Sequence, residues 1–457
     1  MSAFPTRRSI RGCTRDINHA LLILVTGLLM WGLPSVRFTP RTVDAAFNGI
    51  AAMDFTAWFQ VGTCAFAGLV VFVKCAARIR KGLSPLPTAL FRGPTASFLA
   101  YSVVAFASAV YSISAAFTIY SASKILLLLL SSALLVRDYG GGMFAARVCL
   151  RLFYTVNILQ WIVIAVLFCI APDLAGIIDP KVGYRLNGGI FGDYGRAAAF
   201  SGVYFLAIAL RSHGGKRWLP VVGYALSWMF VLLSLTRGTM IFAAVVMCVM
   251  VAAKYRARAR LLLTCATFGV LGCIIFSGAL DEILTFSARG ESRADLQSLT
   301  GRAQAFHFLV AGWRESPILG LGYGAGNRYL LLHFQEQAGL AIGAAHDAVS
   351  RVLADLGLVG AALLLIATVH LCIATYGMWR HTKRNAAARE LAVQFVGLLI
   401  YILIFSVISS GIAEVPAQVA LVALATRALH NQSRRVAVLR TASGSRPALP
   451  INDLCAS

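Results

Sequence analysis

Residues 116–136 read AFTIYSASKILLLLLSSALLV, and this stretch decides the fold class. An α-helix rises about 1.5 Å per residue, so about 20 apolar residues cross the roughly 30 Å hydrocarbon core of a bilayer. Backbone groups that face lipid must be satisfied within their own segment, which favours helices. The stretch therefore predicts a transmembrane helix. Lys124 near its middle must face a polar interior, either in a binding site or in an internal ion pair.

The rest of the chain repeats this pattern. Hydrophobic residues make up 59% of the 457 residues and charged residues 13%, and the mean hydropathy is +0.76. That composition leaves too little polar surface to cover a soluble protein. We predict an all-α, polytopic membrane protein that forms a single membrane domain over residues 1–457. Its roughly twelve spans are expected near residues 18–34, 55–73, 95–112, 116–136, 149–171, 197–211, 218–236, 239–253, 261–280, 352–378, 391–411 and 415–430.

The distribution of charge predicts the orientation. The net charge is +23. With the N-terminus inside, most basic residues fall in cytoplasmic segments, as the positive-inside rule requires, so both termini are expected in the cytoplasm. Topology and contact with anionic lipid explain the positive charge, and nucleic-acid binding is not expected. The segments concerned include residues 7–15, 74–92, 137–151, 211–217, 254–260 and 380–389.

The N-terminal segment and the cysteines indicate how the chain is targeted and whether it forms disulfides. The apolar run 20–33 follows an arginine-rich start, but no small-residue cleavage site comes after it, so we interpret it as an uncleaved first span. None of the ten cysteines falls in a segment assigned to the outside. Neither an external disulfide nor a Cys-x-x-Cys metal site is therefore expected.

One large extramembrane segment, residues 281–346, is expected on the outer face. Within it, residues 301–315 predict an amphipathic helix with Ala305 or Phe306, Leu309 and Trp313 on one stripe, and Pro317 ends it. The run GLGYGAG follows at 320–326. No strand precedes it and no Lys-Ser/Thr follows, which argues against a nucleotide-binding loop. We interpret it as a turn whose backbone approaches the substrate or a neighbouring helix.

Two arginines on the outer face are candidate ligands for an anion. Arg237 lies in Ser234-Leu235-Thr236-Arg237-Gly238, between two spans, where a guanidinium near hydrocarbon is costly unless it is paired, functional or snorkelling to the head groups. Arg185 lies in the loop 172–196 beside glycines that allow close backbone approach. It either contacts the substrate or belongs to an ordinary solvated loop.

His346 is the candidate proton acceptor. It precedes a predicted span and is followed by Asp347, Arg351 and Asp355. An imidazole near carboxylates at the membrane surface is suited to taking a proton near neutral pH. His307 and His333 also fall outside, and we interpret them as ordinary surface residues.

With these residues in place, the chain resembles the O-antigen ligase and O-antigen polymerase superfamily of bacterial membrane glycosyltransferases. The shared elements are the Ser-x-Ser-Arg-Gly-like stretch 234–238, Gly301-Arg302 at the start of the large loop, the Trp-x-x-x-Pro-x-x-Gly-x-Gly run 313–322, and His346 eleven residues before Gly357. The resemblance is densest over residues 185–365. Two positions depart from the family pattern, Asp347 for Asn or Ser and Asp193-Tyr194 for Pro-Asn.

The resemblance implies transfer of a glycan from undecaprenyl diphosphate to an acceptor hydroxyl at the periplasmic face of the inner membrane. It implies no nucleotide sugar, no metal and no other cofactor. The acceptor would be lipid A core in a ligase, or a second lipid-linked glycan in an O-antigen or exopolysaccharide polymerase. Arg237 and Arg302, with Arg185 and Lys124, would bind pyrophosphate, and His346 would deprotonate the acceptor.

Two other classes remain as alternatives. A transporter or flippase for lipid-linked sugars would also need many spans and buried cations, but it predicts internal repeats, and none is evident in the sequence. The second alternative is a protein without transferase activity, either a structural partner in a polysaccharide assembly complex or an inactive homologue. Ligase and polymerase share donor chemistry, so the sequence does not separate them.

Overall fold

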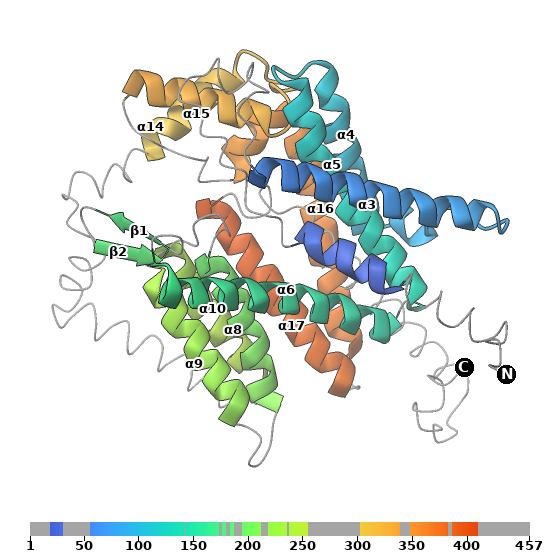
Figure 1. The fold of residues 1–457 in the computed structure, drawn as a ribbon, viewed down its shortest axis with the longest axis vertical. Coiled ribbons are helices and arrows are strands. Elements are labelled where there is room, and N and C mark those ends of the chain that lie inside the picture. The colour runs from blue at the N-terminus through green and yellow to red at the C-terminus, as the bar shows by residue number, and fades with distance from the viewer. Residues whose placement is uncertain are drawn as a thin grey trace, which may run out of the picture.

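The protein is a bundle of helices with one short hairpin (Figure 1). The structure, a computed structural model, describes residues 19–30, 55–140, 142–172, 176–179, 183–186, 194–211, 218–234, 237–254, 302–338, 348–382 and 386–409. After a helix over His19–Met30, the helices are α3 (Phe55–Ile79), α4 (Pro94–Ala107), α5 (Ala115–Asp138), α6 (Gly142–Ile170), α8 (Tyr194–Arg211), α9 (Trp218–Leu233), α10 (Arg237–Lys254), α14 (Arg302–Trp313), α15 (Ala325–Ala338), α16 (Ala348–His381) and α17 (Ala386–Ser409).

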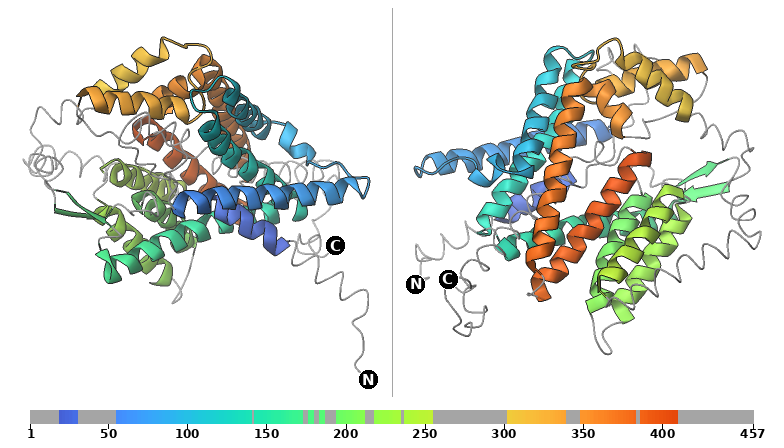
Figure 2. Two further views of the ribbon diagram at one scale, coloured as in Figure 1. Left: turned by 45° about the horizontal axis from the view of Figure 1, so that its top comes forward. Right: turned by 180° about the vertical axis from the view of Figure 1, so that it is seen from behind.

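The helices pack in two groups that α16 and α17 join. In the first, α16 contacts α4, α14 and α15, and α5 contacts α3 and α4. In the second, α8 contacts α6, α9, α10 and α17. Figures 1 and 2 show α14 and α15 together at one end of the first group, and α8, α9 and α10 side by side in the second. The contacts of α16 with α17 and of α5 with α6 connect the groups.

Aromatic side chains fill the interior of the second group. The ring of Phe200 on α8 lies 5.0 Å from that of Phe153 on α6 and 4.9 Å from that of Tyr401 on α17, measured between centroids. All three side chains are buried. Without a strong hydrophobic drive between lipid-embedded helices, such van der Waals packing is what holds α6, α8 and α17 together.

The hydropathy prediction locates helices well, and the predicted number of spans is only partly tested. Ten of the twelve expected spans fall on described helices; 261–280 and 415–430 lie outside the described residues. Among the described residues, five helices are long and apolar enough to cross a membrane: Val61–Ile79, Ala115–Asp138, Gly142–Ile170, Ala348–His381 and Ala388–Ser406. The protein is therefore a multispan membrane protein.

The two predicted spans 95–112 and 116–136 are separate helices. α4 and the 3-10 turn Ser108–Val110 end before residues 111–114, and α5 begins at Ala115. Tyr323 ties the two ends together, because its N–H donates to Ser108 Oγ at 3.0 Å and its carbonyl accepts from Thr118 Oγ1 at 3.1 Å. The end of α4 and the start of α5 thus lie at the same end of the bundle.

A β-hairpin is the exception to the predicted all-α fold. β1 (Gly176–Asp179) pairs antiparallel with β2 (Gly183–Leu186), and Arg185 lies opposite Ile177. The sequence analysis placed these residues in an irregular loop. The hairpin precedes α8 and lies at the same end of the second group as the start of α8 (Figures 1 and 2).

A break in α16 is the central feature of the first group. Gly357 has φ 61° and ψ −156°, which interrupts the helix. The backbone groups released there pair with residues 317–322, which we call the glycine loop. The N–H groups of Leu321 and Gly322 donate to the carbonyls of Ala354 and Asp355 at 3.0 and 2.9 Å. In return, the N–H of Leu358 donates to the Pro317 carbonyl at 2.9 Å.

Glycines are required because two backbones meet. A Cβ atom at Gly320 would lie 2.6 Å from the carbonyl carbon of Asp355, and one at Gly357 would collide with the Ile318 carbonyl. Gly320, Gly322 and Gly357 also have positive φ, which disfavours any other residue. The interpretation that the run approaches a neighbouring helix is confirmed: the helix is α16.

We predict that Gly357→Ala destabilises the protein. The positive φ alone costs roughly 1–2 kcal/mol for a residue with a Cβ atom, and the collision with Ile318 also displaces the glycine loop. The expected result is a lower apparent melting temperature in detergent and faster proteolysis near residues 313–326. Gly62→Ala in α3 is the matched control, since nothing lies within 4 Å of its Cβ position. An unchanged melting temperature for Gly357→Ala would contradict the docking.

The two ends of α5 carry segments that the sequence analysis assigns to opposite faces of the membrane. At its last turn, Asp138 accepts a hydrogen bond from Lys74 of α3 at 2.8 Å, next to the basic segment 78–81. At its first turn, Thr118 holds the glycine-rich segment through Tyr323. The predicted cytoplasmic cations and the predicted outer loop are therefore separated by the length of α5.

We predict that Leu319→Cys is labelled from the outside and Lys81→Cys only from the inside. Both positions are exposed, so a single cysteine at each, in a variant lacking the native cysteines, is accessible to a membrane-impermeant maleimide. Labelling of intact spheroplasts at 319 and not at 81 is the expected outcome. The reverse pattern would invert the orientation.

Candidate functional site

The element that carries Arg237 is built into the second helical group. α9 ends at Leu233, Ser234 donates to the Val231 carbonyl at 2.7 Å, and α10 begins at Arg237. This turn lies against the start of α8, because a Cβ atom at Gly195 would lie 2.7 Å from Ser234 Oγ and 3.5 Å from the Thr239 methyl carbon. Arg237 therefore begins α10 at the end of the bundle where α8 begins.

Arg185 belongs to the same end of this group. It lies on β2, and the hairpin is next to the starts of α8 and α10 (Figure 1). Arg196 follows in the first turn of α8, where its side chain is partly buried. Helix N-termini carry partial positive charge, so the starts of α8 and α10 add to the charge of these arginines. The arrangement suits an anion.

Arg302 lies in the first group instead. It is the first residue of α14, which packs on α15 and α16. Ala305 and Leu309 are buried against Leu330, Leu331 and Phe334 of α15 and Ala354 of α16. The predicted apolar stripe is confirmed for Ala305 and Leu309, whereas Phe306 is exposed. The packing fixes the start of α14 relative to α16.

A hydrogen bond of Trp313 connects the end of α14 to the glycine loop. Trp313 is the last residue of α14, and its Nε1–H donates to the Pro317 carbonyl at 2.9 Å. The same carbonyl receives the N–H of Leu358 beyond the break in α16. The Trp-x-x-x-Pro-x-x-Gly-x-Gly run is thus a structural element that joins α14 to α16. The space in front of its glycines is filled by the backbone of α16 at Gly320 and by Ser112 at Gly322.

His346 and Asp347 lie outside the described residues, immediately ahead of α16. The described part of their sequence neighbourhood is Arg351 and Asp355, one turn apart on α16. Asp355 is buried, and its Oδ1 accepts the N–H of Asn327 at 2.7 Å. Asp355, one of the carboxylates that follow His346 in the sequence, therefore caps the start of α15.

The other two outer histidines have ordinary surroundings. His333 on α15 lies with its Nδ1 3.5 Å from Glu336 Oε2, and its ring packs edge-on against Tyr329. His307 on α14 packs its ring against that of Phe306. These contacts are typical of helix surfaces, which makes both residues suitable controls.

Lys124 lies on α5 and belongs to the first group. Its side chain is partly buried, and Nζ lies 4.6 Å from the centre of the Tyr120 ring. On the same face of α5, Phe117 and Ser121 contact Gly324 at the start of α15. Arg328 follows on α15, with its guanidinium carbon 5.2 Å from the centre of the Phe117 ring. The sequence analysis did not identify Arg328, although it lies two residues after the glycine run.

The predicted site residues thus fall into two sets. Arg185 and Arg237 lie at one end of the second group, while Lys124 and Arg302 lie in the first. His346 comes two residues before α16 in the sequence and lies outside the described residues. Within the described ranges, no three His, Cys, Asp or Glu side chains come together as a metal site would need.

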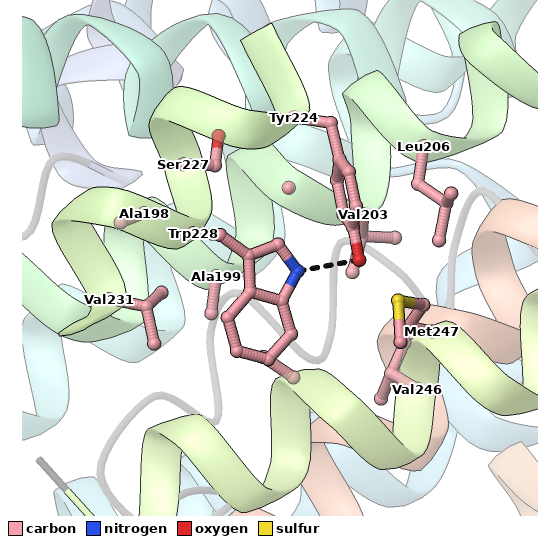
Figure 3. Close-up of a pocket in the computed structure, with 12 residues that line it drawn as sticks. Ala198, Ala199, Val203, Leu206, Tyr224, Ser227, Trp228, Val231, Val246 and Met247 are labelled. Carbon is pink, nitrogen blue, oxygen red and sulfur yellow. Dashed lines mark hydrogen bonds between the residues drawn. The ribbon is translucent and has the colours of Figure 1, made fainter. Parts of the chain in front are cut away.

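A small apolar crevice lies between α8, α9 and α10 (Figure 3). Its polar groups are already engaged: Trp228 Nε1–H donates to Tyr224 Oη, and Ser227 Oγ donates to the Gly223 carbonyl at 2.8 Å. No charged side chain lines the crevice. The crevice therefore suits a hydrocarbon chain and not the phosphate groups of a substrate. Its lining is Ala198, Ala199, Gly202, Val203, Leu206, Tyr224, Ser227, Trp228, Val231, Ala243, Val246 and Met247.

Comparison with known proteins points to one family over the central segment. No curated protein matches the sequence. Residues 222–365 match the family model described as O-antigen ligase, and this segment holds Arg237, Arg302, the glycine loop, His346 and the break in α16. Residues 222–365 are therefore similar to the O-antigen ligase family, which confirms the resemblance of the chain to the O-antigen ligase and polymerase superfamily.

Proposed function

We propose that the protein is a glycosyltransferase of the bacterial inner membrane that moves a glycan from undecaprenyl diphosphate to an acceptor hydroxyl at the periplasmic face. The observation that carries this proposal is the O-antigen ligase match, because it spans both arginines and the histidine. The docking of the glycine loop on α16 adds a physical reason. It fixes the start of α14, where Arg302 lies, relative to the start of α16, which follows His346.

The reaction is a displacement at the anomeric carbon. The acceptor oxygen attacks that carbon, the bond from it to the pyrophosphate oxygen breaks, and the acceptor proton passes to His346. Undecaprenyl diphosphate leaves with the bonding electrons. Direct displacement inverts the anomeric centre.

Fixed cations assist the departure of the pyrophosphate. Negative charge grows on its oxygens in the transition state, and preorganised donors stabilise such charge most effectively. Arg185, Arg237 and Arg302 supply planar guanidinium groups that match phosphate oxygens in two-point hydrogen bonds. These arginines take the role that a metal ion plays in other transferases, so the proposed mechanism uses no metal and no nucleotide sugar.

The proposed orientation places both termini in the cytoplasm. It is supported by the separation of the basic segment 78–81 from the glycine loop by the length of α5. The last turn of α16, with Arg380 and His381, lies at the opposite end of that helix from its start beside His346. The site is then periplasmic. Its acceptor is lipid A core or a second lipid-linked glycan, in ligation or in polymerisation of O-antigen or exopolysaccharide.

We predict that Arg237→Ala and Arg302→Ala each lower the rate of glycan transfer by about 10² to 10³, the usual loss when one donor to a developing oxyanion is removed. The corresponding lysine variants should recover part of the rate, because they keep the charge and lose the fork. The assay uses purified full-length protein with lipid-linked donor. Arg389→Ala, whose guanidinium stacks on Trp379 near the end of α16, is the control. A fully active Arg237→Ala or Arg302→Ala variant would remove that residue from the mechanism.

We predict that His346→Ala loses about 10² to 10⁴ in turnover, the typical contribution of a general base. Donor binding should survive, since the arginines carry it. His307→Ala and His333→Ala should retain activity, consistent with their surface contacts. Rates measured at saturating donor and acceptor test this assignment. Normal turnover of His346→Ala, or a defect confined to donor affinity, would show that the histidine is not the base.

A further inference from the structure

The apolar crevice between α8, α9 and α10 begins near the end of the second group where Arg237 lies. Ala198 comes four residues after the start of α8, and Val231 comes two residues before the end of α9. Ala243 comes six residues after Arg237, the first residue of α10. On all three helices, the lining of the crevice therefore starts within two turns of that end.

The crevice also reaches a similar depth along each helix. Its lining residues farthest from that end are Leu206 on α8, Tyr224 on α9 and Met247 on α10. Counted from the start of α8, the end of α9 and the start of α10, they lie twelve, nine and ten residues along. At about 1.5 Å per residue this depth is roughly 15 Å, half of the roughly 30 Å hydrocarbon core. On the proposed orientation, the crevice occupies the outer half of the membrane.

The crevice has a buried floor and a half-buried rim. On the floor, Ala198, Ala199 and Gly202 of α8 are buried, and they are too small to fill the space beside them. On the rim, Trp228 of α9 and Met247 of α10 are half-buried (Figure 3). Because α9 and α10 both pack on α8, the crevice opens between them.

The two aromatic side chains of the crevice offer apolar surfaces to an occupant. Trp228 Nε1–H donates to Tyr224 Oη, so these polar atoms already satisfy each other. The two rings meet edge to face, with centroids 6.5 Å apart and an interplanar angle of 82°. Met247 adds a thioether, which adapts to irregular apolar shapes. The occupant is therefore held by van der Waals contacts, which are individually small and add up along a chain.

The charge at the end of the group selects which hydrocarbon chain enters. Bilayer hydrocarbon is as apolar as the crevice, so burial alone does not choose between lipids. The starts of α8 and α10 carry partial positive charge, and Arg185 and Arg237 lie at the same end (Figure 1). A diphosphate carries more negative charge than the phosphodiester of a phospholipid. Two arginines and two helix starts therefore favour a lipid with a diphosphate head group.

We propose that the apolar crevice holds the first isoprene units of the donor's polyprenyl chain, with the pyrophosphate at the starts of α8 and α10. This inference rests on the proposed transferase function. A chain attached to a pyrophosphate at that end has its first carbons next to the crevice, which begins within two turns. The hydrocarbon chain of the donor is then recognised together with its pyrophosphate.

The test uses photolabelling of the purified full-length protein in detergent. The probe is a tetraprenyl diphosphate that carries a diazirine in its first isoprene unit. Labelled peptides are expected from α8, α9 and α10. Ala243→Phe should lower the labelling about tenfold, the factor for about 1.4 kcal/mol of lost packing, because its ring fills the crevice from the rim. Ala244→Phe is the matched control, since the adjacent alanine is also half-buried and does not line the crevice.

Competition identifies the lipid that the crevice accepts. Unlabelled undecaprenyl diphosphate should displace the probe, whereas dioleoyl phosphatidylglycerol at the same concentration should not. Equal displacement by both lipids would assign the crevice to bilayer lipid and overturn the proposal. Labels confined to helices other than α8, α9 and α10 would overturn it too, as would equal losses in Ala243→Phe and Ala244→Phe. If Ala243→Phe loses its melting transition, Met247→Trp fills the same crevice one turn further along α10 and is held to the same expectation.

Failure of the proposed function has a different signature, because photolabelling requires no glycan transfer. If the wild-type protein transfers no glycan from any lipid-linked donor, the transferase proposal is contradicted. Labelling of the crevice that Ala243→Phe removes would still support a site for a polyprenyl diphosphate. Conversely, an active protein whose donor KM and labelling are unchanged by Ala243→Phe would overturn the crevice proposal and leave the transferase proposal intact.

Discussion

The backbone pairing between the glycine loop and the broken α16 is the interaction on which the rest of the described site depends. A helix that breaks near a membrane surface exposes carbonyl and N–H groups, and each is costly to leave unsatisfied away from water. Residues 317–322 satisfy them from both sides of Gly357. Because the two segments complete each other's hydrogen bonds, neither is expected to hold its conformation alone.

This pairing positions elements that lie far apart in the sequence. In the chain, α14 leads into the glycine loop and α15 follows it. Hydrogen bonds of Tyr323 join the end of α4 to the start of α5. Asp355, on α16, then caps α15. These contacts therefore place α14, α15 and α16 relative to one another. Alternating glycines serve this purpose better than they serve a phosphate, because the space in front of them is filled by α16 and by side chains of residues 112–121.

Hydropathy predicted the helices and the separation of α4 from α5, and the glycine content of 320–326 predicted a turn that approaches either the substrate or a neighbouring helix. These features depend on local composition, which the sequence displays directly. The contacts between segments that are far apart in the sequence were harder to predict. Positive φ at Gly357 and Gly320 is a local property, but nothing local shows that these residues meet. Asp355 follows His346 in the sequence, and its contact with Asn327, 28 residues away, could not be read from that spacing. The hairpin 176–186 was missed because four-residue strands show little periodicity.

Two sets of cations on two helical groups are what a transferase with two anionic, lipid-linked substrates needs. A single cationic surface would bind both substrates without distinguishing them, and their mutual repulsion would oppose simultaneous binding. Arg185 lies on β2 and Arg237 begins α10, both in the second group, whereas Lys124 lies on α5 in the first. Arg302 begins α14, which also belongs to the first group. On the proposed mechanism, the pyrophosphate would therefore lie between the two groups, which are joined by the contacts of α16 with α17 and of α5 with α6.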